Sequence, residues 1–139
     1  MGLTLRYLDD SRGVMATASG AVTGKELIGA VRQVNAFAVN IKAICYTFFD
    51  FAEVSEISIS TADLAKASEC AIEAAKLVDT ERIIAIFASD EFAYRLALIY
   101  MTFIEQTGWE AWAFRDRAEA VAWLRSHVAR KHGVMVDLE

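Results

Sequence analysis

The stretch Ala43-Ile-Cys-Tyr-Thr-Phe-Phe49 is a nearly continuous apolar run that is closed by Asp50. A second run of the same kind follows at Ile83-Ile-Ala-Ile-Phe-Ala88. Short apolar runs of this type are typical of strands that are covered on both faces, as in parallel sheets. The two runs therefore predict central strands, and the residues around them should supply the layers that cover the sheet.

The residues before the first run indicate a β-hairpin. Apolar and polar residues alternate over 3–8 and again over 14–19, and the turn cluster Asp9-Asp-Ser-Arg-Gly13 separates the two segments. A short connection of this kind predicts an antiparallel pair, which leaves one antiparallel strand at an edge of the sheet. The segment 51–59, which follows the first apolar run, indicates an irregular stretch with room for a short extended piece.

Four helices are predicted from their capping residues. A Ser, Thr or Asp that precedes an acidic residue by three positions can form a capping box at a helix N-terminus. Such pairs occur at Thr23/Glu26, Ser60/Asp63 and Asp116/Glu119, and a further helix is expected from Ser89-Asp90 to Gly108. The first helix is expected to end before Lys42, and Trp109–Phe114 is expected to form the fifth strand.

The predicted element order is therefore ββαβαβαβα. Strands that alternate with helices favour parallel pairing through right-handed crossovers. We expect an α/β fold with a single mixed, mostly parallel five-stranded sheet and four helices, whose strand order the sequence leaves open. Residues 1–132 are assigned to one domain and 133–139 to a C-terminal tail, in which Leu138-Glu139 could be a cloning remnant.

Composition argues against several classes of function. The net charge of −5 disfavours nucleic-acid binding, which relies on Lys and Arg to neutralise phosphates. The two cysteines form no C-x-x-C motif and no signal peptide is recognised, so a reducing, cytoplasmic location is expected. The most apolar helix, Phe92–Ile104, is shorter than the ~20 residues of a transmembrane span. This helix should be either fully buried or partly exposed at an interface between two copies of the chain, so a homodimer is one hypothesis.

Catalytic motifs are not found in the sequence. Phosphate-binding glycine motifs and the G-x-S-x-G elbow are missing. His127 and His132 are five residues apart, whereas zinc-binding pairs on a helix are four apart. We therefore expect no catalytic residue, no metal site and no cofactor, and the chain is interpreted as a non-enzyme.

Two groups of residues are candidates for a binding site. Ligands of open α/β sheets bind beyond the C-terminal ends of the strands, and this places Asp50, Phe51, Ser89 and Asp90 at a ligand or partner edge. The hydroxyl residues Ser58, Ser60 and Thr61 precede a helix, whose N-terminus attracts anions, so they are candidates for phosphorylation or anion binding. The competing interpretations are a turn residue for Asp50, and helix-start residues for Asp90 and Ser60.

The order and spacing of these segments resemble the SpoIIAA-like group of STAS domains. The resemblance rests on the opening hairpin, Ser19-Gly-Ala-Val-Thr23, Phe49-Asp50, Ile83–Asp90 and Arg117-Ala-Glu-Ala-Val-Ala-Trp-Leu124. STAS regulators carry a phosphorylatable serine in an Asp-Ser-Ser-Gly-like motif before the second helix. The matching stretch here is Ile57-Ser-Ile-Ser-Thr-Ala-Asp-Leu64, which lacks the Asp and the Gly of that motif and places Ser60 and Thr61 near the acceptor position.

The resemblance implies a non-enzymatic regulatory or protein-interaction module whose partner is another protein. A second hypothesis is a carrier or sensor of a small apolar ligand or lipid. It rests on the aromatic-rich strand edge near Phe51 and on a looser analogy to the pocket of the related SEC14-type fold.

Overall fold

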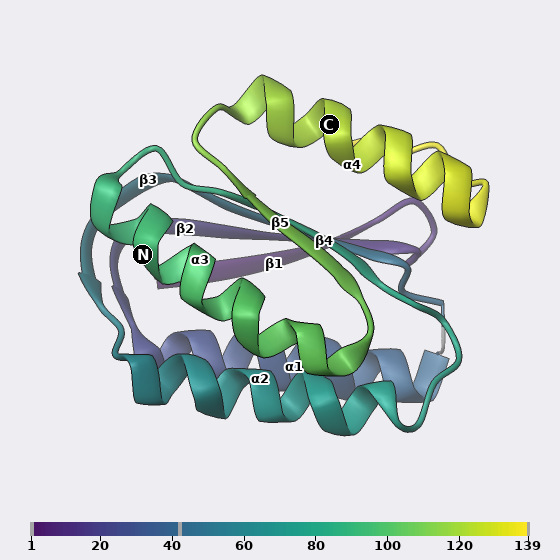
Figure 1. Cartoon of the computed structure of the whole chain (residues 1–139), viewed down its shortest axis with the longest axis horizontal. Coiled ribbons are helices and arrows are strands. Elements are labelled where there is room, and N and C mark those ends of the chain that lie inside the picture. The colour runs from purple at the N-terminus through teal and green to yellow at the C-terminus, as the bar shows by residue number, and fades with distance from the viewer. Residues whose placement is uncertain (1, 42, 139) are drawn as a thin grey trace.

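The computed structural model describes residues 2–41 and 43–138 and confirms the predicted fold class. In this part of the chain a five-stranded mixed sheet is covered by helices on both faces (Figure 1). The elements are β1 (Gly2–Leu8), β2 (Gly13–Thr23), α1 (Gly24–Ile41), β3 (Tyr46–Ser58), α2 (Thr61–Ala75), β4 (Ile83–Phe87), α3 (Glu91–Ile104), the 3₁₀ turn η1 (Glu105–Thr107), β5 (Glu110–Phe114) and α4 (Arg117–His132).

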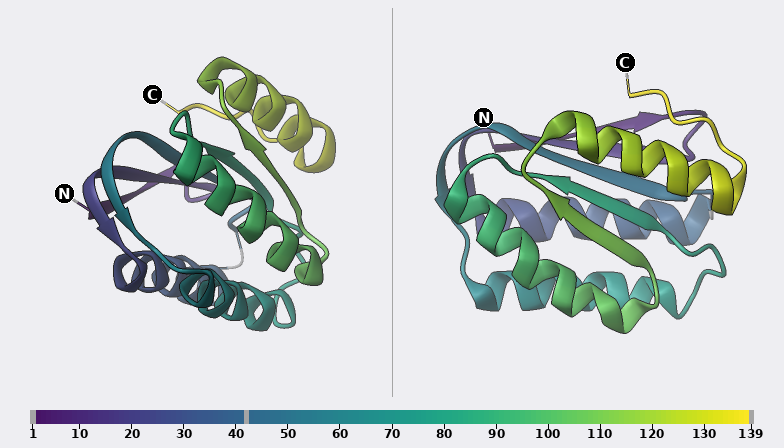
Figure 2. Two further views of the ribbon diagram at one scale, coloured as in Figure 1. Left: turned by 60° about the vertical axis from the view of Figure 1, so that its left-hand side comes forward. Right: turned by 45° about the horizontal axis from the view of Figure 1, so that its top comes forward.

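The strands lie in the sheet in the same order as in the chain, β1-β2-β3-β4-β5. β1 pairs antiparallel with β2, as the hairpin pattern predicts, and the other neighbours pair in parallel. Right-handed crossovers that all advance in one direction place their helices on one face of the sheet. The helices α1, α2 and α3 accordingly share one hydrophobic core, and α4 lies on the opposite face (Figures 1 and 2).

The two apolar runs pack on both faces of the sheet, as expected for central strands. Phe49 and Ile84 belong to the core under α1, α2 and α3, whereas Phe48 and Ile83 belong to the core under α4. Because side chains alternate between faces along a strand, each run supplies two separate cores.

The expectation of an irregular segment over 51–59 is wrong. β3 continues to Ser58 and stays paired with β2, from Gly13↔Tyr46 to Thr23↔Ser58. β4 pairs only up to Asp50↔Phe87, so the second half of β3 has a neighbour on one side and is largely exposed. An exposed strand needs no apolar run. The pairing of β2 with β3 also shifts in register next to Thr17 and Gly20. The sequence signal of a buried strand is therefore missing there.

The predicted helix starts are confirmed by their hydrogen bonds. Ser60 and Asp63 form a complete capping box, and Thr23 N–H donates to Glu26 Oε1 at 2.9 Å. Asp116 caps α4 by accepting a hydrogen bond from Glu119 N–H at 3.0 Å. Gly108 follows α3 and its 3₁₀ turn in the left-handed conformation, with φ of 81°. The helix α1 ends at Ile41, and Lys42 lies outside the described residues.

The residues that follow α4 pack back onto the domain. Val136 and Leu138 are both buried in the core under α4. Arg6 Nη2 donates to the Leu138 carbonyl at 2.8 Å, and Arg125 Nε donates to the Val136 carbonyl at 3.3 Å. The assignment of residues 133–139 to a separate tail stays a prediction, and Glu139 lies outside the described residues.

Candidate functional site

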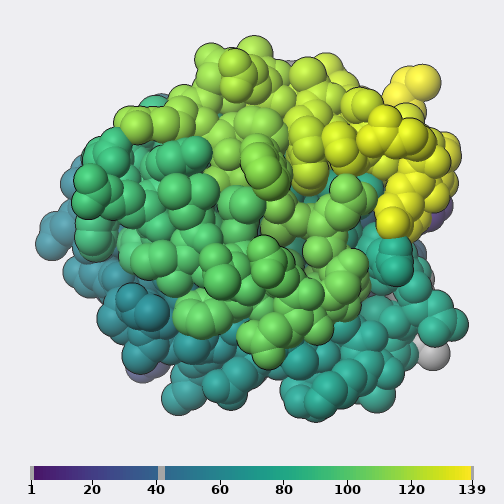
Figure 3. Space-filling model, in the orientation of Figure 1, coloured from purple at the N-terminus to yellow at the C-terminus, as the bar shows by residue number. Residues whose placement is uncertain are grey.

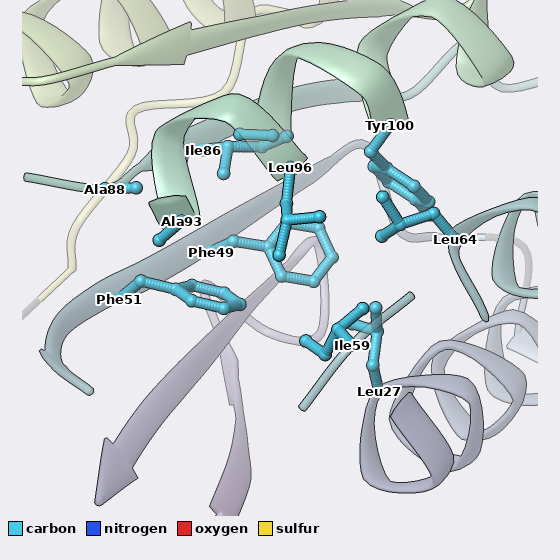
Figure 4. A pocket seen from close by; sticks show the side chains of 11 residues that line it. Leu27, Phe49, Phe51, Ile59, Leu64, Ile86, Ala88, Ala93, Leu96 and Tyr100 are labelled. Carbon is cyan, nitrogen blue, oxygen red and sulfur yellow. The ribbon is translucent and has the colours of Figure 1, made fainter. Parts of the chain in front are cut away.

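An apolar pocket lies between the sheet and the helices α1, α2 and α3, near the C-terminal ends of β3 and β4 (Figure 4). Its walls are aliphatic and aromatic side chains, among them Leu27, Phe49, Ile59 and Leu96. The centre of a water-sized sphere can occupy about 40 Å³ of it. Since a buried water needs roughly 10–15 Å³ by this measure, the pocket takes a few small apolar groups and is too small for a long lipid chain.

Two of the predicted groups flank this pocket. Ser60 lies between Ile59 and Leu64, and both of these residues line the pocket. Asp90 lies between Ala88 and Ala93, which line it from the other side. The structure therefore brings the start of α2 and the start of α3 to one pocket, although the two segments are some 30 residues apart in the sequence.

The hydroxyl residues at the start of α2 are exposed. Ser60 Oγ accepts a hydrogen bond from Asp63 N–H at 3.1 Å, so this side chain acts as the helix N-cap. Ser58 ends β3 and Thr61 is the first residue of α2, and both are exposed at the same end of the molecule. Gly24 at the start of α1 lies so close that a Cβ there would meet the Asp63 carboxylate at 2.0 Å. The N-termini of α1 and α2 are thus in contact.

The two predicted residues at the end of the first apolar run point to opposite faces of the sheet. Phe51 lines the pocket, whereas Asp50 is buried on the side of α4. Asp50 Oδ2 accepts from Arg117 Nε at 3.2 Å and Asp50 Oδ1 accepts from Ala52 N–H at 3.0 Å. Asp50 therefore ties β3 to the start of α4, and it does not reach the pocket.

At the start of α3, Asp90 acts as the N-cap by accepting from Ala93 N–H at 3.0 Å. Ser89 is exposed, and its carbonyl accepts from Arg115 Nη2 at 3.2 Å. Arg115 also pairs with Glu91 at 2.7 Å. Hydrogen bonds from Arg95 and Arg115 lower the pKa of the Glu91 carboxyl. The basic residues after β5 were missed from the sequence, although they follow a predicted strand at the same sheet edge.

The helix α3 is partly buried and partly exposed. Ala93, Ala97 and Tyr100 are buried, whereas Phe92 and Leu98 are 52% and 42% exposed. Trp112, on the edge strand β5, is 54% exposed. Figure 3 shows the face of the molecule on which α3, β5 and α4 lie next to one another.

Within residues 2–41 and 43–138, no cluster of three or more His, Cys, Asp or Glu side chains could hold a metal ion. The ring nitrogens of the two histidines are close to backbone carbonyls, His127 Nδ1 to Trp123 at 2.9 Å and His132 Nε2 to Glu81 at 2.7 Å. Among the helices of the described residues, none is long and apolar enough to cross a membrane.

The fold is that of SpoIIAA-like proteins. The chain is similar to an uncharacterized protein of the DUF3478 family with a SpoIIAA-like fold from Shewanella loihica PV-4, with a TM-score of 0.54, 18% identity, and coverage of 88% of this chain and 91% of the other. It is also similar to the anti-sigma factor antagonist SpoIIAA in its unphosphorylated form, with a TM-score of 0.53, 11% identity, and coverage of 88% and 97%. At these identities the likeness shows the fold alone.

No protein-family description matches the sequence, and no curated protein matches it. The sheet topology and these two likenesses define an α/β protein with a SpoIIAA-like fold.

Proposed function

We propose that this chain is a non-enzymatic regulatory module of the cytoplasm that binds another protein through the end of the molecule formed by the start of α2 and the rim of the apolar pocket. The observation that carries the proposal is the exposure of Ser58, Ser60 and Thr61 beside that pocket. An apolar depression next to polar groups that can hydrogen-bond is the usual composition of a protein-binding patch. The likeness to an anti-sigma factor antagonist supports the same class of role.

Electrostatics make this end suitable for control by phosphorylation. The first N–H groups of a helix and its dipole favour negative charge. A phosphate on Thr61, the first residue of α2, would be tolerated by the fold, whereas it would place a charge beside an apolar partner surface. Ser60 is a weaker candidate because its hydroxyl already caps the helix.

The test is a charge substitution with a matched control. Thr61→Glu and Ser58→Glu place a negative charge at the proposed surface, and Ser126→Glu places the same charge on exposed α4 on the opposite face of the sheet. Partners captured by the wild-type chain are identified and their affinities are then measured for each variant. We expect Thr61→Glu to weaken binding about tenfold, which is about 1.4 kcal/mol, and Ser126→Glu to leave it unchanged.

A result of equal affinity for all three variants would place the partner elsewhere and would refute the proposal for this surface. Thermal unfolding serves as the folding control. A negative charge in the first turn of a helix stabilises it by about 0.3–1 kcal/mol, so Thr61→Glu should not lower the Tm. Capture of the chain by a second copy of itself would support an interaction module that acts as a homodimer.

A second candidate function is a carrier or sensor of a small apolar ligand, which the apolar lining of the pocket favours. Native mass spectrometry of gently purified protein tests it. A bound compound that disappears from Leu96→Trp, which fills the pocket, and persists in Leu77→Trp, an exposed position, would support it. A ligand-free mass and no thermal shift with short alcohols would refute it.

A further inference from the structure

A cation is buried in the larger core with no carboxylate partner among the residues that the structure describes. Arg82, the residue before β4, is only 4% exposed. Its Nη1 donates to Asn35 Oδ1 at 2.9 Å, and the guanidinium lies over the Trp109 ring, 4.3 Å from the centroid. Within residues 2–41 and 43–138 no Asp or Glu forms an ion pair with it. Its contacts are neutral, and the fold leaves the charge unbalanced.

The guanidinium borders a second cavity, between the sheet and the helices α1, α2 and α3. Asn35, Thr47 and Tyr100 also line this cavity. Two buried polar atoms here, Arg82 Nε and Thr47 Oγ1, have no hydrogen-bond partner in the described chain. Thr47 pairs with Ile84 in the β3–β4 ladder, so it lies diagonally next to Arg82 on the same face of the sheet. Two unpaired donors are thus gathered at one cavity.

The remaining side chains orient the site. Asn35 Nδ2 donates to the Val31 carbonyl at 2.8 Å, which turns its oxygen toward Arg82. One guanidinium nitrogen is therefore occupied, and the Nε edge remains. That edge carries two parallel N–H groups, the fork that guanidinium groups use with planar oxyanions, and Thr47 Oγ1 lines the same cavity as a further donor.

Energetics also favour an anion. The effective penalty for burying an ion in a protein is several kcal/mol unless it is paired. Burial lowers the pKa of Arg82 to about 10, so the side chain is still charged at neutral pH. A neutral water could satisfy the hydrogen bonds, whereas only an anion can also balance the charge.

The size of the cavity limits the ligand. The centre of a water-sized sphere can occupy about 20 Å³ of it, more than the roughly 10–15 Å³ that one water needs, so only a group of a few heavy atoms fits. This excludes a fatty acid or an aromatic acid. We infer that Arg82, Thr47 and Asn35 form a site for a small planar monovalent oxyanion, with Arg82 Nε and Thr47 Oγ1 donating to its oxygens. The site is independent of the proposed partner surface.

The experiment measures thermal unfolding of the full chain and ¹³C NMR binding with formate and bicarbonate as probes. Sodium chloride at equal ionic strength is the control for general salt effects, and benzoate is the control for size. At ten times the Kd, a ligand specific for the folded state should raise the Tm by about 4 °C. We expect this rise with formate or bicarbonate, and none with chloride or benzoate.

The variants separate a site from a general salt effect. Arg82→Met keeps most of the buried volume and removes the charge, and apolar replacement of a buried ion is often tolerated. We expect it to abolish the Tm rise, and we expect Thr47→Val to weaken binding about tenfold. Lys76→Met removes a charge from the exposed surface of α2 and should have no effect.

The outcomes also distinguish the sources of the anion. Binding of formate alone would assign the site to a small organic acid, and binding of bicarbonate alone would assign it to an inorganic anion. No saturable ¹³C signal change with either probe in the wild-type protein would overturn the proposal, whether or not Arg82→Met folds. An equal Tm rise in Arg82→Met and the wild type would overturn it as well.

Discussion

Substitution of Gly13, the first residue of β2, tests the packing of the core under α4. A Cβ at this position would lie 2.0, 2.2 and 2.5 Å from three atoms of the Tyr46 ring. Ordinary contacts of a Cβ lie at about 3.4–4 Å, so the ring would have to move by more than 1 Å. Tyr46 is fully buried, and its hydroxyl donates to Asp9 Oδ2 at 2.5 Å, which leaves the ring little freedom to move.

We therefore expect Gly13→Ala to lower the free energy of unfolding by about 3 kcal/mol, the upper part of the range for overpacked cores. Urea unfolding followed by circular dichroism measures it. Gly29→Ala is the matched control, because the new Cβ in α1 would meet no atom within 4 Å beyond its chain neighbours and the adjacent backbone of its own helix. Alanine is favoured over glycine inside a helix by up to about 1 kcal/mol, so the control should gain stability.

A double-mutant cycle isolates the steric cause. Tyr46→Leu removes the distal ring atoms that the new Cβ would meet, so Gly13→Ala should cost about 2 kcal/mol less in that background than in the wild type, within the usual range of coupling between residues in contact. Additive effects of the two substitutions, or a loss below about 0.5 kcal/mol for Gly13→Ala, would refute the packing of Gly13 against the ring.

Two further predictions concern the α2 cap and alkaline pH. Ser60→Ala removes the cap of α2 and should lower the unfolding free energy by about 1 kcal/mol, whereas the exposed control Ser126→Ala should change it by less than about 0.5 kcal/mol; equal effects in calorimetry would contradict the capping role. Burial and the hydrogen bond to Asp9 raise the pKa of Tyr46 above its ordinary value. A raised folded pKa gives stability that is present below the unfolded pKa of about 10 and is lost above it, by about 1.4 kcal/mol per pH unit. Tyr46→Phe should lose less stability than the wild type between about pH 10 and 11, measured by urea unfolding with phenolate absorbance, and parallel pH profiles would contradict this.

The local sequence was sufficient to predict an element wherever its residue pattern is compatible with only one kind of structure. The Ser60/Asp63 box had to start a helix, because both side chains satisfy backbone N–H groups that a helix start leaves free. The run 43–49 predicts a strand covered on both faces, because no polar face remains for solvent, and β3 begins within this run at Tyr46. The exposed half of β3 escaped prediction, because a strand whose only support is backbone pairing with β2 carries no apolar signature.

The candidate site shows the same division. The residues Ser60 and Asp90 were recognised from their places before helices, and the structure adds that they flank one pocket. The sequence assigns Asp50 and Phe51 to one edge because both follow a strand that is expected to end at Phe49. The strand instead continues through them to Ser58, and its alternation separates their side chains onto opposite faces. Side chains at adjacent positions of a strand point to opposite faces of the sheet, whereas the starts of two helices that are distant in the chain can lie beside the same pocket.

Apart from the second half of β3, the amino-acid sequence by itself determined the elements, their caps, the hairpin and the mostly parallel character of the sheet, because these depend on interactions within a few residues or on apolar periodicity. Only the tertiary structure decided the strand order, the pocket between α1, α2 and α3, and the unpaired burial of Arg82. Arg82 gives no local signal, because a charged residue before a strand is usually solvated. Its surroundings come from Asn35, Thr47 and Trp109, which are distant in the chain and meet only when the layers close.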